Sequence, residues 1–325
     1  MFFSYAMCYN YNGDGMERKI FKTLDEQIEI MRNKGLIIND EEKTKEILFK
    51  ENYFFINGYR WLFMEGYKDR RFIKGATFEE MYATFTFDRN IRNVMFKYIL
   101  IIENNIKSII SYQLSRKYGI KEKDYLNPKN FTQDSLKIRQ VKDVLNKMKR
   151  QIRVNTQKHT ATLHYISNYG YIPLWVLVKV LSFGIISELF NILKPDDQYK
   201  IADEYGIEAE TLSIYLNILA NFRNLCAHED ILYDHRTQRV IPDDVIHSRL
   251  NIEKDVDQYK YGKNDLFALM IIFKYMLDSD KFKELINELG YEIDVLDGKV
   301  DSVPLDTILN KIGFPSNWRE ITNIG

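Results

Sequence analysis

The sequence predicts an all-α protein, a bundle of long antiparallel helices with shorter helical additions at the N- and C-terminal ends. Six prolines in 325 residues leave few interruptions for helices. Apolar residues recur over long stretches at spacings of three and four, which is the helical period. The principal helices are expected at residues 85–118, 136–158, 173–194, 210–228 and 265–277.

Composition limits the class of protein. Hydrophobic residues make up 45% of the chain, which allows a sizeable core. The formal net charge of +0 argues against a uniformly basic nucleic-acid-binding protein but permits a local basic patch. No apolar run approaches 18 residues, so no transmembrane helix is expected. Of the two cysteines, Cys8 and Cys226, the second lies on a predicted core stripe, which favours free thiols and a cytoplasmic location.

The N-terminal part predicts short helices. Thr23 is a suitable N-cap, Glu26 completes a capping box and Gly35 ends the helix. A second helix is expected at residues 40–49. The aromatic stretch 52–63 that follows has two interpretations: core packing, which we favour, or bases stacked beside Arg60.

The predicted helix 85–118 carries Glu103 near its middle, on the shoulder of its apolar stripe. A carboxylate in that position needs a partner if it is buried. Arg223 is the obvious candidate. The alternative is that Glu103 is an exposed residue on the flank of the helix.

The predicted helix 136–158 is strongly basic. Between Lys137 and His159 it has one acidic residue, Asp143, and a local net charge of +7. We interpret this ridge as a binding surface for RNA phosphates, against the alternative of an ordinary solvated face. His159 and His164 are expected in a polar loop, where the absence of nearby Cys or acidic ligands makes a zinc site improbable. The basic residues are Lys137, Arg139, Lys142, Lys147, Lys149, Arg150, Arg153 and Lys158.

The predicted helix 173–194 is apolar nearly all round, which indicates a central position or a shared interface. Further helices are expected at residues 265–277, 281–290 and 304–312. We divide the chain into a disordered extension (1–16), an N-terminal helical segment that packs on the core (17–83), a helical core (84–280) and a C-terminal helical tail (281–325).

The predicted helix 210–228 has two unlike faces. One face is an apolar stripe suited to the core. The other carries Asn217, Asn221, Asn224 and His228 at spacings of four, three and four. Asparagine is a mediocre helix former, so helix propensity does not explain this polar stripe. The apolar stripe consists of Leu212, Tyr215, Leu216, Leu219, Phe222 and Cys226.

Arg223 and His228 suit phosphate chemistry. Arginine grips phosphate oxygens in a fork, and histidine moves protons near neutral pH. Their five-residue separation places them well apart around an ideal helix. They therefore converge only through side-chain reach, a distorted last turn, or a second copy of the helix. The alternative is a capped helix end with Arg223 in a surface ion pair.

These residues carry a family resemblance. The string Phe222-Arg-Asn-Leu-Cys-Ala-His228 resembles the Arg-polar-(x)n-His signature of the HEPN superfamily, and in particular its AbiD/AbiF-like abortive-infection branch. The similarity extends over about residues 17–320. Further matching stretches, in order, are 24–36, 52–59, 76–80 with 87–89, 173–175 with 181–184, and 313–318.

The resemblance implies a HEPN-like bundle, a homodimer and an antiphage endoribonuclease toxin that needs no cofactor or metal. It implies that Arg223, Asn224 and His228 are catalytic, and we assign supporting roles to Asn217, Asn221 and Glu103. A companion non-coding RNA would restrain the toxin, as in toxin–antitoxin pairs. The alternative is a non-catalytic RNA-binding module that uses the same Arg and His. The candidate RNA-binding residues are Lys142, Lys147, Lys149, Arg150, Arg153, Lys158 and Arg60.

Overall fold

The computed structural model describes residues 20–66 and 70–324, and its long elements are all helices. Within that part, the regular sheet is one antiparallel pair of two-residue strands, β1 (Lys254–Asp255) and β2 (Gln258–Tyr259). The predicted all-α class is therefore confirmed. The extension at 1–16 and Cys8 lie outside the described residues.

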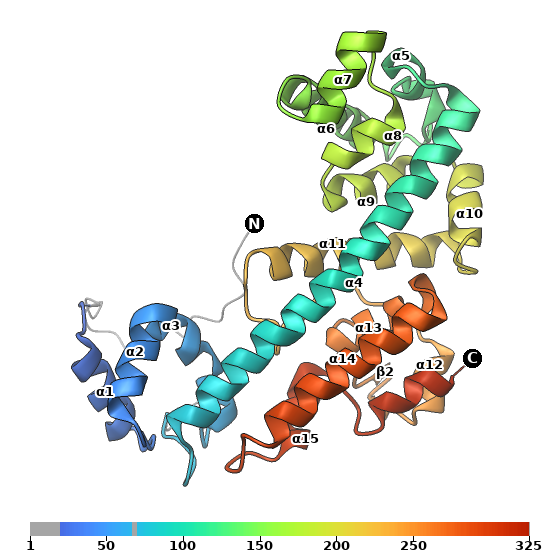
Figure 1. Cartoon of the computed structure of the whole chain (residues 1–325). Helices are drawn as coiled ribbons and strands as arrows, with labels where there is room; N and C mark the ends of the chain where they lie inside the picture. Colours follow the sequence, from blue (N-terminus) through green and yellow to red (C-terminus); the bar gives the residue numbers. More distant parts are fainter. Residues whose placement is uncertain (1–19, 67–69, 325) are drawn as a thin grey trace.

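The axis of the fold is α4 (Phe78–Tyr118), a helix of 41 residues. At 1.5 Å per residue it is about 60 Å long, and it runs through the whole molecule in Figure 1. We expected the long helix only from residue 85. That start is wrong, because no helix breaker lies between Phe78 and residue 85 and the capping box of Thr77 and Glu80 starts one continuous helix at Phe78.

The N-terminal lobe lies at the start of α4 (Figure 1). The capping box of Thr23 and Glu26 is confirmed at the first helix, and Gly35, with φ +93°, follows its end. Arg89 of α4 binds Glu51 of the lobe through two hydrogen bonds of 3.0 and 2.6 Å. The lobe consists of α1 (Leu24–Asn33), α2 (Glu41–Glu51), α3 (Tyr53–Ile56) and the 3-10 helix η1 (Asn57–Phe63).

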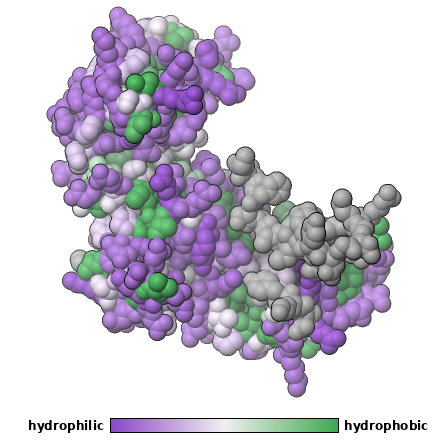
Figure 2. Space-filling model, turned by 180° about the vertical axis from the view of Figure 1, so that it is seen from behind, coloured by the Kyte–Doolittle hydropathy of each residue, from purple (hydrophilic) through white to green (hydrophobic). Residues whose placement is uncertain are grey.

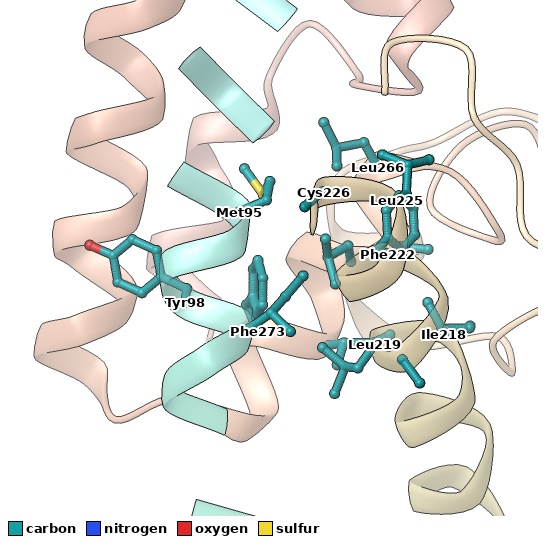
Figure 3. Packing of buried hydrophobic residues seen from close by; sticks show 14 of the residues in the cluster. Met95, Tyr98, Ile218, Leu219, Phe222, Leu225, Cys226, Leu266 and Phe273 are labelled. Carbon is teal, nitrogen blue, oxygen red and sulfur yellow. The ribbon is translucent and has the colours of Figure 1, made fainter. Parts of the chain in front are cut away.

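The core forms where α11 (Ala209–Ala227) and α13 (Leu266–Met276) pack beside α4. Figure 3 shows Phe222 and Leu219 of α11 directed toward Met95 of α4 and Phe273 of α13. Antiparallel to α4 along its other side lies α14 (Ser279–Asp297), tied to it by Glu288 and Glu292. The chain then adds α15 (Leu305–Ile312) and the 3-10 helix η4 (Trp318–Asn323); α12 (Val245–Arg249) precedes the strands.

A second lobe lies at the far end of α4 (Figure 1). The expected helix 136–158 is present as α6 (Ile138–Asn155). The polar loop expected around His159 and His164 is wrong, because α7 (Thr160–Tyr169) forms there and ends at Gly170, with φ +73°. The lobe also contains α5 (Glu122–Tyr125) and the 3-10 helix η2 (Pro128–Asn130).

The single helix expected at 173–194 is also wrong. Leu181 is extended, with φ −82° and ψ 132°, and the side chain of Ser182 accepts a hydrogen bond from the backbone N–H of Ile185. Serine competes with the helix for backbone groups in this way, so a new helix starts there. The stretch forms α8 (Leu174–Leu177), the 3-10 helix η3 (Val178–Val180) and α9 (Phe183–Ile192), followed by α10 (Pro195–Asp203).

The division at 83/84 and 280/281 stays a prediction, and both boundaries fall inside continuous helices, α4 and α14. Across residues 20–66 and 70–324, no helix combines the length and apolar character that crossing a membrane requires.

Glu80 fastens the segment after α14 to the start of α4. Its side chain accepts backbone hydrogen bonds from Asp301 (2.7 Å), Ser302 (2.6 Å) and Thr77 (2.9 Å). Burial raises the pKa of Glu80, but these hydrogen bonds outweigh it and hold the pKa below its usual value. A carboxyl with a lowered folded-state pKa stabilises the fold above its unfolded pKa, and this stabilisation disappears as the pH falls through the folded-state pKa.

We therefore predict that Glu80→Gln lowers the free energy of unfolding by about 2 kcal/mol at pH 7, because three backbone donors lose a charged acceptor. The difference from wild type should shrink below about pH 4.5. Urea unfolding at pH 7 and pH 4 measures it, with Glu29→Gln on the exposed face of α1 as the matched control. An equal loss at both pH values would contradict the assigned role of the charge.

Candidate functional site

The two faces predicted for α11 are both present. All six residues of the apolar stripe are buried, and Figure 3 shows this side of the helix against α4 and α13. Asn217, Asn221, Asn224 and His228 are all exposed. Ser213, one turn before Asn217, extends the polar stripe and donates a hydrogen bond to the side chain of Asn191 in α9. The polar stripe is thus a surface feature that begins at α9 and ends at His228.

Arg223 lies between the two faces and is held by α4. Its Nε lies 3.5 Å from Oε2 of Glu103, whose other oxygen accepts a hydrogen bond of 2.6 Å from Lys107. The guanidinium carbon lies 5.7 Å from the centre of the Phe96 ring. The expected pairing of Glu103 with Arg223 is therefore confirmed, and the alternative of an exposed Glu103 is wrong.

The geometry of that pair leaves part of the guanidinium free. The Arg223 side chain is 32% exposed, whereas Glu103 is 7% exposed. In the described chain, Nε of Arg223 and Oε2 of Glu103 are buried without a hydrogen-bond partner, so each depends on this ion pair. The ion pair holds the Nε edge of the guanidinium against Glu103, and it leaves the two terminal nitrogens available to bind an anion.

His228 caps the C-terminal end of α11. Its backbone N–H bonds to the carbonyl of Asn224 at 3.0 Å, and the described chain provides no side-chain hydrogen bond between the two. The N–H of Glu229 bonds to Cys226, and the N–H of Asp230 bonds to Leu225. These bonds form a Schellman motif, in which the residue after the cap is left-handed and is usually glycine. Here that residue is Glu229, with φ +56°.

A buried charge pair of α4 fixes the chain just after His228. Asp88 is fully buried and accepts hydrogen bonds from Arg92 (2.6 Å), Tyr59 (2.7 Å) and the backbone N–H of Leu232 (3.1 Å). Arg92 also donates to the carbonyl of Asp230 at 3.0 Å. We call Asp88, Arg92 and Tyr59 the clamp. Its partners lie two and four residues after His228, so it determines where α11 ends.

The clamp stays charged at neutral pH. Burial raises the pKa of Asp88 to about 6, against the opposing effects of Arg92, Tyr59 and the backbone donors. The carboxyl therefore remains an anion at pH 7. Asp88 was not predicted as a site residue. The one sequence feature that indicates its pairing with Arg92 is their spacing of four on the same helix.

A second histidine approaches the polar stripe and was also missed. Nε2 of His235 lies 2.6 Å from Oδ1 of Asn221, and its ring meets Phe222 edge-on at 5.2 Å. Burial lowers the pKa of His235, followed by the nearby charge of Arg236. A neutral imidazole donates through Nε2–H to the amide oxygen. The only sequence feature that could have indicated His235 is its position seven residues after His228.

The basic residues of α6 form a continuous ridge. Lys142, Lys147, Lys149, Arg150 and Arg153 are exposed on the helix, and Lys158 follows its end. Lys147 is paired with Glu188 of α9 at 2.6 Å, so its charge is partly neutralised. Shallow hollows border the ridge on both sides, one lined by α5 and η2, the other by α6 residues alone.

Arg60 is not part of this ridge. It lies in η1, over the ring of Trp61 at 4.4 Å, in the lobe at the opposite end of α4 (Figure 1). Of the aromatic residues around it, Tyr59 and Phe63 belong to the core as we favoured, while Phe54 and Phe55 are exposed. Within residues 20–66 and 70–324, no group of three or more His, Cys, Asp and Glu side chains is placed to hold a metal ion.

Comparison with known proteins adds one finding. A family model described as Abi-like protein matches residues 46–234, which is more than half of the chain and includes both α4 and α11. No curated protein and no solved structure matches the chain.

The strain at Glu229 gives a direct test of the helix end. A left-handed conformation costs an L-residue about 1 kcal/mol that glycine does not lose. We predict that Glu229→Gly raises the free energy of unfolding by up to about 1 kcal/mol. Glu229→Ala, which also removes the charge but keeps the Cβ atom, is the matched control and should give no such gain. Urea unfolding measures both variants, and equal stability of the two would contradict the strained cap.

Proposed function

Since the chain belongs to the Abi-like protein family, and is therefore an abortive-infection protein, we propose that it is a toxin that cleaves RNA at the C-terminal end of α11. One observation carries the proposal. Arg223 and His228 occupy the same helix end, with the guanidinium held by a buried carboxylate and the imidazole exposed to solvent. Such a pair can bind a phosphate group and transfer a proton, which are two tasks in the cleavage of RNA by its own 2′-hydroxyl.

Arg223 is suited to the phosphate. Nε of Arg223 is paired with Glu103, and Phe96 lies beside the guanidinium. These two contacts restrict rotation of the planar guanidinium group. The terminal nitrogens then present donors to two oxygens of one phosphate. As negative charge develops on those oxygens, a donor already in place stabilises it without reorganisation. Asn224, exposed beside Arg223, supplies a further donor to a phosphate oxygen.

His228 is suited to proton transfer. In the proposed reaction the 2′-oxygen of the RNA attacks the adjacent phosphorus and gives up its proton, and the bond from phosphorus to the 5′-oxygen breaks. The leaving 5′-oxygen takes up a proton. The products are a 2′,3′-cyclic phosphate and a 5′-hydroxyl. The imidazole of His228 serves as the base or the acid in these steps, because a histidine side chain can both accept and donate a proton, and the reaction as proposed uses no metal ion.

A homodimer completes the proposed site. Five residues at 3.6 per turn separate Arg223 and His228 by roughly 140° around α11. In the described chain no hydrogen bond or ion pair joins their side chains. The exposed asparagines of the polar stripe leave a polar helix face open to a second copy. In such a pair, each Arg223 complements the His228 of the other chain.

The basic ridge of α6 supports a second part of the proposal, restraint by a non-coding RNA. The whole chain has a formal net charge of +0, but exposed Lys and Arg side chains gather positive charge on α6. The ridge is connected to the polar stripe through α9, because Glu188 binds Lys147 and Asn191 binds Ser213. An RNA on the ridge therefore lies on the same surface as the start of the stripe.

One observation favours a second candidate, an RNA-binding module without catalysis. The imidazole of His228 has no side-chain hydrogen bond in the described chain, although catalytic histidines are commonly oriented by one. Under this alternative Arg223 and His228 grip phosphate without proton transfer. The two candidates differ in cleavage, not in binding.

We predict that His228→Ala and Arg223→Ala each abolish toxicity on induction in cells while the protein stays folded. Thermal unfolding should be unchanged in His228→Ala and should shift to a lower temperature in Arg223→Ala, because that change leaves Oε2 of Glu103 without its ion-pair partner. Arg223→Lys should also lose most toxicity, because an ammonium cannot bind a phosphate in a fork. Arg249→Ala, which removes an exposed arginine at the end of α12, is the matched control and should remain toxic. Full toxicity of the His228→Ala or Arg223→Ala protein would overturn the nuclease proposal.

A second prediction concerns the ridge. The triple variant Lys149→Glu, Arg150→Glu, Arg153→Glu should weaken binding of the RNA that copurifies with the chain. The slope of log affinity against log salt should fall by about 0.7 for each lost phosphate contact to a single strand. The matched control reverses three exposed lysines elsewhere, Lys43, Lys283 and Lys299. Unchanged affinity in the ridge variant would place the RNA on another surface.

A further inference from the structure

The surface of α7 is unusual for an exposed helix. Residues 160–169 contain no Lys, Arg, Asp or Glu, and Thr162 is the one fully buried residue. Exposed helices normally turn a charged face to water. Here the exposed residues are Thr160, Leu163, His164, Ser167, Asn168 and Tyr169, and Tyr165 is partly buried against the core. A solvated face does not explain this composition.

The aromatic rings form a continuous ladder. The ring centres of His164 and Tyr165 are 5.6 Å apart, those of Tyr165 and Tyr169 5.3 Å, and those of Tyr169 and Tyr171 6.5 Å. These are contact distances for aromatic pairs. The ammonium of Lys121 lies 5.5 Å from the ring of Tyr171 and extends the ladder with a cation. Tyr169, in the middle, is 58% exposed.

The ladder is fixed to the lobe. Thr162 donates hydrogen bonds to the carbonyls of Asn155 (2.5 Å) and His159 (2.8 Å), which ties the first turn of α7 to the end of α6. Asn168 donates to the carbonyl of His164 at 2.8 Å and lies 3.2 Å from its Nδ1. The rings therefore occupy defined positions next to the basic ridge.

The ladder adjoins a hollow that the ridge itself borders. Lys149 and Arg153 of α6 line one side of this hollow, and Glu122 and Lys123 of α5 line the other. Glu122 also accepts a hydrogen bond of 2.6 Å from the backbone N–H of Ile172, the residue after Tyr171. The ridge, the hollow and the ladder thus follow one another on a single lobe.

The charge of the lobe identifies the kind of partner. Between residues 119 and 172 there are eleven Lys and Arg against four Asp and Glu, a net charge of +7. This side of the molecule is mostly hydrophilic, in agreement with Figure 2, where the lobe opposite the grey atoms is largely purple. A polyanion with flat apolar groups fits both features.

We propose that this lobe binds single-stranded RNA, with its backbone along the α6 ridge and unpaired bases stacked on the ladder of His164, Tyr165, Tyr169 and Tyr171. Aromatic rings stack on any base, and a basic groove follows the backbone without reading sequence. A duplex keeps the faces of its bases covered, so the ladder selects unpaired strands. The choice of RNA over DNA rests on the proposed function.

The test is binding of a fluorescent oligouridylate of about 12 nucleotides, within the usual site sizes for single strands. The full chain carries His228→Ala to prevent cleavage, and anisotropy reports affinity. Tyr169→Leu should weaken binding at least about fivefold, as expected for loss of one stacked base. Tyr169→Phe keeps the ring and should bind like the parent. Because neither change alters charge, the salt dependence should remain the same.

The controls separate the possible results. Tyr291→Leu, an equally exposed tyrosine on α14, should leave affinity unchanged. The same strand paired with oligoadenylate should bind equally to the parent and to Tyr169→Leu. Equal single-strand affinity of the Leu and Phe variants would overturn the proposal, and so would an equal loss for single strand and duplex. Tighter binding of oligodeoxyuridylate than of oligouridylate would overturn the assignment to RNA.

A failed test of the ladder can be distinguished from a failed test of the nuclease. Cleavage is measured on the chain with His228 intact, and stacking on the chain that lacks it. If Tyr169→Leu binds normally while wild type cleaves, the ladder is overturned and the nuclease stands. If the parent binds no oligonucleotide, both the ladder and the RNA-binding ridge are overturned, and the cleavage assay still decides the function of α11.

Discussion

The arrangement of the site depends on one buried charge pair, Asp88 with Arg92. Removing two charges from water is costly unless each finds several partners, and here the partners are Tyr59 of the N-terminal lobe and the backbone at Asp230 and Leu232. The pair thereby joins three parts of the chain at one point. It connects the N-terminal lobe to α4, and α4 to the segment that leaves α11. His228 and the left-handed Glu229 are held between this anchor and the helix.

A second charge pair acts on the same helix end. Glu103 and Lys107 are buried on α4, with Glu103 about three turns beyond Arg92 of the clamp, and Glu103 reaches across to Arg223. Through these two pairs α4 determines the position of both residues of the proposed site. Buried ion pairs are weak evidence for stability, because apolar residues often stabilise a core equally well. Their presence at this place therefore suggests that they position functional groups rather than only hold the fold.

Much of this structure follows from local sequence patterns. The helix of the motif, its two faces and the cap at Thr23 were predicted from spacing and capping residues, because these are local effects. The break at Leu181 and the helix at 160–169 were missed, since an apolar run hides a serine N-cap and an uncharged stretch resembles a loop. Asp88 and His235 were not assigned. Asp88 has a partner four residues away, Arg92, but its role at the end of α11 depends on Leu232, 144 residues away, and His235 contacts Asn221, 14 residues away. The pairing of Glu103 with Arg223 was predicted because a carboxylate beside an apolar stripe has few possible partners.

The measurement that tests the central claim most directly is the chemistry of the RNA ends. Purified wild type and His228→Ala would be freed of bound RNA and incubated with cellular RNA in EDTA, and the new ends would be identified. We predict 2′,3′-cyclic phosphate and 5′-hydroxyl ends with wild type and none with His228→Ala. If neither protein cleaves the added RNA although both bind it, the result would contradict the nuclease and favour an RNA-binding module.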